Sequence, residues 1–157
     1  MPPYAGESFS IARPVPRMRQ PSFLLTKEAT VFQYTHGVKD SEQISPDAYT
    51  FDQFFLDRPG NDAIQLDLLH NYQSNIALYD SWHEYFRNQQ PRMLIVWGKN
   101  DPFFTVEGAK AYQRDLRKAE LHLIDTGHFA LEDSSEFIAA RIRKFFRVGE
   151  PPQIETH

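Results

Sequence analysis

Two short apolar runs, each broken by a glycine and followed by a titratable residue, constrain this chain more than any other feature. The first run, residues 93–97, precedes Asp101, and the second, residues 121–124, precedes His128. Each has the length of a buried β-strand. The segment between them has helical periodicity, with Thr105 as its expected N-cap. This order predicts two neighbouring parallel strands joined by a crossover helix.

The end of the chain extends this pattern with a second helix. Asp133 is the expected N-cap, and Glu136 stands three residues later as a capping-box partner. Residues 91–148 are therefore predicted to form a β-α-β-α unit of the α/β class. Ligands of parallel sheets bind beyond the carboxyl ends of the strands, so Asp101 and His128 are expected at the same edge.

Residues 23–90 have apolar residues at helical spacing and no convincing strand. Thr26 predicts one helix start, and Ser45 followed by proline predicts another. The Pro59-Gly60 pair predicts a break between helices. We expect three or four amphipathic helices in this segment.

Aromatic residues make up 14% of the chain, and many lie in residues 49–86. We expect most of them to pack in the core, the alternative being that some line an apolar substrate pocket. Trp82, Tyr34 and Tyr49 are the candidates for such a pocket, because Tyr and Trp combine an apolar ring with a hydrogen-bond donor.

The two ends of the chain differ from the rest. Residues 1–22 combine scattered prolines and arginines without periodicity and are expected to form a disordered arm or one unrelated to the domain. Residues 149–157 are expected to form a tail.

Composition excludes several function classes. The net charge of −4 argues against a nucleic-acid-binding protein, which needs a basic face. No apolar run approaches the roughly 20 residues that cross a membrane, and no signal peptide is visible, so a cytoplasmic location is expected. The chain has no cysteine, and its histidines lack ligand spacing, so we expect no metal.

Asp101 and His128 suit the roles of orienting acid and general base. A carboxylate beside an imidazole holds one tautomer and stabilises the imidazolium that forms during proton transfer. Taken singly, the segment around Asp101 and the segment around His128 each also fit a turn or helix end that has no catalytic role. Their shared placement after strands favours the catalytic interpretation.

With these motifs in place, residues 24–147 resemble the C-terminal half of an α/β-hydrolase, of the branch that includes haloalkane dehalogenases and epoxide hydrolases. Residues 97–104 (WGKNDPFF) are similar to the loop that bears the triad acid, and residues 125–132 (DTGHFALE) to the loop that bears the catalytic histidine. The resemblance implies that residues 23–90 form the cap or lid, and that no cofactor is needed.

The resemblance also implies parts that this sequence lacks. The family's nucleophile stands in a G-x-S-x-G or G-x-D-x-G elbow, and the closest fragment here begins at Gly60 without the second glycine. The early strands of the sheet have no counterpart either, so the expected fold is a partial α/β-hydrolase without the N-terminal half of the sheet. A truncation, an alternative start or a shifted reading frame would produce this pattern.

Two functions remain open at this point. The first is a hydrolase that acts on a small apolar ester, haloalkane or epoxide, with the nucleophile missing from this chain, which alone is expected to be inactive. The second is a non-catalytic remnant that acts as a binding or self-associating module. Exposed sheet edges favour self-association in either case.

Overall fold

The first two α-helices begin where a short polar side chain caps them. The computed structural model describes residues 21–147. Helix α1 (Lys27–Thr35) follows Thr26, whose hydroxyl accepts a first-turn amide at 3.2 Å. Helix α2 (Pro46–Leu56) follows Ser45, which accepts a first-turn amide at 3.3 Å. Both predicted helix starts are confirmed.

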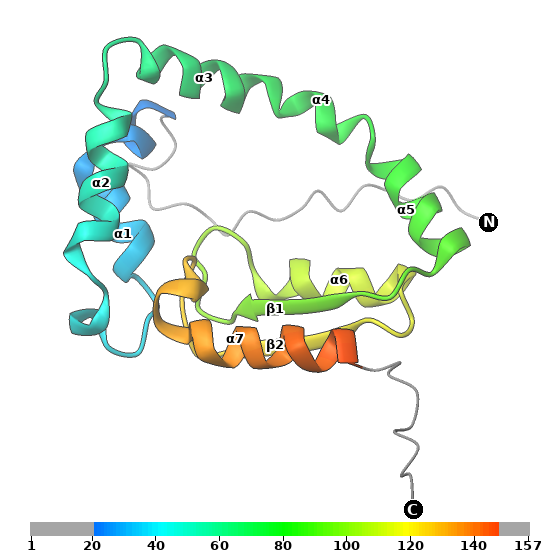
Figure 1. Cartoon of the computed structure of the whole chain (residues 1–157). Coiled ribbons are helices and arrows are strands. Elements are labelled where there is room, and N and C mark those ends of the chain that lie inside the picture. Colours follow the sequence, from blue (N-terminus) through cyan, green and yellow to red (C-terminus); the bar gives the residue numbers. More distant parts are fainter. Residues whose placement is uncertain (1–20, 148–157) are drawn as a thin grey trace, which may run out of the picture.

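Three further helices lead from α2 toward the sheet. These helices are α3 (Asn61–Asn71), α4 (Gln73–Ile76) and α5 (Tyr79–Gln89). Two short 3-10 helices, η2 (Pro21–Leu25) and η3 (Ser41–Gln43), precede α1 and α2. The predicted break before α3 is confirmed at Gly60, whose φ of 84° is left-handed. Figure 1 shows α3 and α4 spanning the distance from α2 to α5 as an arch above the sheet.

The second half of the chain folds as the predicted β-α-β-α unit. Strands β1 (Leu94–Gly98) and β2 (Glu120–Ile124) pair in parallel, residue for residue, and α6 (Val106–Asp115) connects them. Helix α7 (Ala130–Arg147) follows β2. Both α6 and α7 pack on β1, and Figure 1 shows them on either side of the strands as drawn. The α/β class with parallel strands is therefore confirmed.

The start of the last helix differs from the prediction. Helix α7 begins at Ala130 and is kinked at Ser134, where φ is −128° and ψ is 19°. The predicted N-cap, Asp133, instead accepts the Thr126 hydroxyl at 2.7 Å. Thr126 is fully buried, so its hydroxyl requires a partner within the protein. The predicted cap of Asp133 with Glu136 is wrong because this tertiary contact takes the carboxylate.

The core is small and lies in two places. The buried apolar residues are Ala29, Tyr34 and Ile44 around α1, and Ile95, Ala109, Leu116 and Ile138 around the sheet. Gln53 ties α1 to α2 through a polar contact: its side-chain oxygen accepts the Thr30 hydroxyl at 2.7 Å. Both residues are buried, so this hydrogen bond takes the place of apolar packing there.

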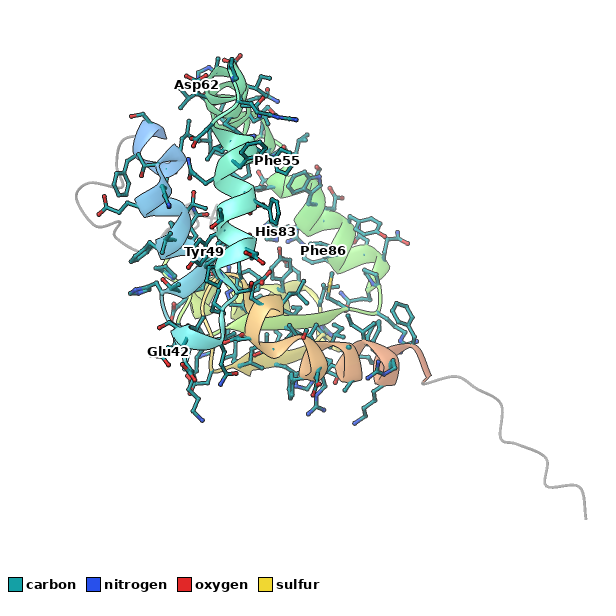
Figure 2. All side chains as sticks on the ribbon, turned by 60° about the vertical axis from the view of Figure 1, so that its left-hand side comes forward. Glu42, Tyr49, Phe55, Asp62, His83 and Phe86 are labelled. Carbon is teal, nitrogen blue, oxygen red and sulfur yellow. The ribbon has the colours of Figure 1, made fainter. Side chains whose placement is uncertain are left out.

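Most aromatic residues of the helical segment lie outside the core. Phe51, Phe54, Phe55, Tyr72 and Tyr85 are between 47% and 64% exposed. Figure 2 shows Tyr49 and Phe55 along α2 and Asp62 at the start of α3. The expectation that these aromatic residues fill the core is wrong, because their helices form an arch with few partners among residues 21–147.

Three other sequence expectations concern the flanks and the membrane. The expected N-terminal arm and C-terminal tail lie outside the described residues, apart from residues 21 and 22, which begin η2. Among the helices of the described part, none combines the length and apolar character that a membrane crossing requires.

The exposed apolar surface predicts self-association of the isolated chain. Sedimentation velocity is expected to show masses that rise above 18.3 kDa with increasing concentration. Leu68→Glu on α3 lowers this tendency, because Leu68 is 59% exposed and apolar. His70→Glu adds a carboxylate to the same helix and serves as the control. A single species at 18.3 kDa over a wide concentration range contradicts the prediction.

Candidate functional site

Asp101 and His128 meet at the carboxyl ends of the two strands. The Oδ2 atom of Asp101 lies 2.9 Å from Nδ1 of His128. The Asp101 side chain is 7% exposed and that of His128 is 21% exposed. An imidazole that donates through Nδ1 to a carboxylate carries its lone pair on Nε2, the state required of a general base.

The other oxygen of Asp101 is held by the backbone. Its Oδ1 atom accepts the Phe103 amide at 2.8 Å and the Phe104 amide at 3.0 Å. Burial raises the pKa of Asp101, but the hydrogen bonds from His128 and the two amides outweigh it, so the net pKa is lowered. The carboxylate is therefore ionised and fixed in orientation when it faces His128.

Aromatic rings surround the His128 imidazole. Its ring centroid lies 5.0 Å from those of Phe103 and Phe129 and 5.5 Å from that of Phe104. The ring of Tyr34 in turn stacks on that of Phe129, with the two centroids 4.2 Å apart. Apolar surroundings strengthen the electrostatic contact between the imidazole and the carboxylate by excluding water.

Three glycines permit the loops of the site to cross. A Cβ on Gly98 would lie 2.1 Å from the Gly127 carbonyl oxygen, and a Cβ on Gly127 would lie 2.0 Å from the His36 oxygen. At Gly37, where φ is 80°, a Cβ would lie 2.6 Å from the Asn100 oxygen. The loop after β1, the loop after β2 and the turn after α1 therefore touch backbone to backbone.

Asn100 joins the same three segments through its side chain. Its Nδ2 donates to the Gly37 carbonyl at 2.8 Å and to Oδ1 of Asp125 at 3.0 Å. Its own amide donates to the Thr126 carbonyl at 3.1 Å. Asn100 and then Lys99 lower the pKa of Asp125 by hydrogen bonding. Sequence reasoning missed Asn100, because its partners come from loops far apart in the chain.

The three candidate pocket residues lie in different places. Trp82 lines a cavity of about 230 Å³ that also has Phe104 in its wall. Tyr34 is buried instead, and its hydroxyl donates to Asp52 at 2.5 Å; burial and then this contact raise its pKa. Tyr49 packs edge-on against Tyr34 at 6.0 Å. Tyr34 and Tyr49 therefore lie on the α1–α2 side, away from the walls of this cavity.

The contacts around the pair in the described part of the chain are few. Within residues 21–147, the one hydrogen bond to the His128 ring is that of Asp101. Gly60 stands at a turn between two helices, unlike a strand–turn–helix elbow. The same residues contain no group of three His, Asp or Glu side chains placed to hold a metal ion.

The glycine crossing predicts an unequal response to two alanine substitutions. Gly127→Ala is expected to cost about 1–3 kcal/mol in urea unfolding, because the new methyl group meets the His36 carbonyl. Gly60→Ala is the control. The φ of Gly60 is also unfavourable for alanine and costs about 1 kcal/mol, but no atom lies within 4 Å of the added Cβ. An equal or smaller loss in Gly127→Ala contradicts the crossing.

The lowered pKa of Asp101 predicts how the pair responds to acid. Carbon-13 NMR of the carboxyl group is expected to give a midpoint below 3.8, and the pair's contribution to stability is lost as the pH falls through that midpoint. In His128→Ala the midpoint rises, because one stabilising hydrogen bond is removed while burial remains. Identical midpoints in the two proteins would show that the contact is not formed.

Comparisons with known proteins show which family the chain belongs to. A family model described as a TAP-like protein, of the α/β-hydrolase group, matches residues 78–157, about half of the chain. An uncharacterized hydrolase of Saccharomyces cerevisiae is 40% identical over 116 residues, which cover 74% of this chain and 40% of that protein. The chain thus spans two fifths of the length of this relative. With a parallel two-stranded sheet preceded by helices, it has a partial α/β-hydrolase fold and belongs to the α/β-hydrolase family.

Proposed function

We propose that this chain supplies the acid–base half of a hydrolase active site, with His128 as general base and Asp101 as its orienting acid. The observation that carries the proposal is the 2.9 Å contact between Nδ1 of His128 and Oδ2 of Asp101. The amides of Phe103 and Phe104 hold the other carboxylate oxygen. Family membership supports hydrolysis as the reaction class.

The geometry supports two forms of the reaction. With a hydroxyl nucleophile, Nε2 of His128 takes the hydroxyl proton as the oxygen attacks an ester carbonyl carbon. With a carboxylate nucleophile, an alkyl ester forms as a halide leaves, or as an epoxide opens to an alkoxide that takes a proton from water. His128 then takes a proton from the water that hydrolyses the ester. In both forms Asp101 stabilises the imidazolium.

A small apolar substrate suits the surroundings of the pair. The rings of Phe103, Phe104 and Phe129 form apolar walls around the imidazole. Such walls exclude water and favour an apolar group beside the reacting bond. The resemblance of residues 97–104 and 125–132 to the dehalogenase and epoxide-hydrolase branch supports an alkyl halide or epoxide as well as an ester.

The proposed nucleophile lies outside residues 21–147. The helices of residues 23–90 act as the cap, and α1 reaches the pair through the turn at Gly37. Because Asn100 binds this turn directly, the cap and the catalytic loops form one unit in the proposal. No cofactor enters either form of the reaction.

A second candidate function is a self-associating or binding module without catalysis. The observation that favours it is the exposed apolar surface of α2 and α3. The residues that form this surface are Phe51, Phe54, Phe55, Ile64, Leu68 and Leu69, all at least 46% exposed. In addition, β1 has one edge without a strand partner among the described residues.

Turnover of the native protein tests the catalytic proposal. An antibody against residues 121–131 captures that protein, whose mass is compared with 18.3 kDa and whose hydrolysis of esters, haloalkanes and epoxides is measured. We expect a larger product that is active. Asp101→Asn in it lowers kcat by about 10⁴-fold and His128→Ala by about 10⁶-fold, as for other triads.

His70→Ala is the matched control, since His70 is exposed on α3. It is expected to leave turnover unchanged. Turnover that survives His128→Ala contradicts the proposed general base. An inactive product of 18.3 kDa favours the module without catalysis.

A further inference from the structure

A second histidine–carboxylate pair stands beside the aromatic cavity. Nδ1 of His83, on α5, hydrogen-bonds to Oδ2 of Asp115, at the end of α6. Arg87, one turn further along α5, contacts the other oxygen of Asp115 at 3.1 Å. The Asp115 side chain is only 10% exposed, so the two partners compensate a nearly buried charge. The proposed hydrolysis makes no use of this pair.

The cavity next to His83 has the walls of an aromatic binding site. Its aromatic lining includes Trp82 and Phe86 from α5, Trp97 from β1, Phe104, and Tyr112 from α6. His83 and Phe86 can be followed on α5 in Figure 2. The volume of about 230 Å³ is below the roughly 300 Å³ at which pockets for drug-sized ligands begin, so it suits a molecule of one or two rings.

The hydrogen bond to Asp115 determines what His83 offers to a ligand. A carboxylate accepts the Nδ1 proton, so the neutral ring carries its lone pair on Nε2. Within residues 21–147, the Nδ1 contact is the one hydrogen bond of the His83 ring. Neutral His83 therefore presents a hydrogen-bond acceptor at the edge of an apolar cavity.

Several other polar groups of the lining are engaged with the protein: the Trp97 indole N–H, for example, donates to the Phe104 carbonyl at 2.9 Å. The hydroxyl groups of Tyr72 and Tyr79 lie 2.9 Å apart and hydrogen-bond to each other. Both carboxylate oxygens of Asp115 are taken by His83 and Arg87. We therefore take Nε2 of His83 as the acceptor for a ligand's donor in this cavity.

We infer that this cavity binds a small aromatic molecule that carries an O–H or N–H donor, such as a phenol, with the donor on Nε2 of His83 and the ring between the aromatic walls. Stacked and edge-on contacts hold the ring. The donor is what selects it, because an isosteric molecule without one leaves the imidazole acceptor unpaired. This site goes beyond the proposed hydrolysis, and its test is binding rather than turnover.

The chain contains two tryptophans, Trp82 and Trp97, and both line the cavity. Their fluorescence therefore reports directly on its occupancy. The probes are 4-bromophenol, whose bromine quenches tryptophan emission, and 4-bromoanisole, which has the same ring without the donor. The titrations are run at pH 8, where phenols are ordinarily protonated. We expect 4-bromophenol to bind about 5- to 10-fold more tightly.

His83→Asn separates ligand recognition from the structural role of the pair. Its amide N–H replaces Nδ1 toward Asp115 but leaves no acceptor at the position of Nε2. In this variant both probes are expected to bind with the affinity of 4-bromoanisole, whereas His70→Asn keeps the preference. Ala111→Phe, which fills the cavity from α6, abolishes quenching by both.

Three results overturn the inference: no saturable quenching by 4-bromophenol, equal affinities for the two probes in the unaltered chain, or a preference that persists in His83→Asn. Hydrolase activity is measured in the larger native product, where its retention in His83→Asn leaves the two sites distinguishable, since that activity depends on His128. Loss of activity in His128→Ala with intact quenching separates them in the other direction.

Discussion

The backbone crossing at three glycines is the constraint on which the site depends. Gly98 ends β1, Gly127 lies in the loop after β2 and Gly37 lies in the turn after α1, and at each one a Cβ would lie within 2.6 Å of a carbonyl oxygen. His128 directly follows Gly127, and Asp101 directly follows Asn100, whose carbonyl faces Gly37. Their 2.9 Å contact therefore results from how closely the backbones approach, as well as from attraction between the side chains.

This arrangement makes the helical segment part of the site. Asn100 donates to the Gly37 carbonyl of the turn after α1, while its own amide binds the loop that leads to His128. The buried Thr126 hydroxyl anchors that loop to Asp133 on α7. A displacement of α1 would therefore shift the loops that carry the catalytic pair. The exposed arch of α3 and α4 has no such connection among residues 21–147.

Local signals and topology explain what could be predicted from the sequence. The caps at Thr26 and Ser45 act within one helical turn, and parallel strands place the residues that follow them at one edge, which brings the acid and the base together. The need of the buried Thr126 hydroxyl for a hydrogen-bond partner could not be predicted, because burial depends on the whole fold. The contact between His83 and Asp115 has no motif, since it joins helices from different parts of the chain.

The most direct test of the central claim is the tautomer of His128, measured by long-range ¹⁵N–¹H NMR of the imidazole. A pair held by the crossing loops predicts that the neutral ring carries its proton on Nδ1, facing Asp101, with Nε2 unprotonated and available as a base. A ring protonated mainly on Nε2, or one that exchanges between the two tautomers, would contradict the account.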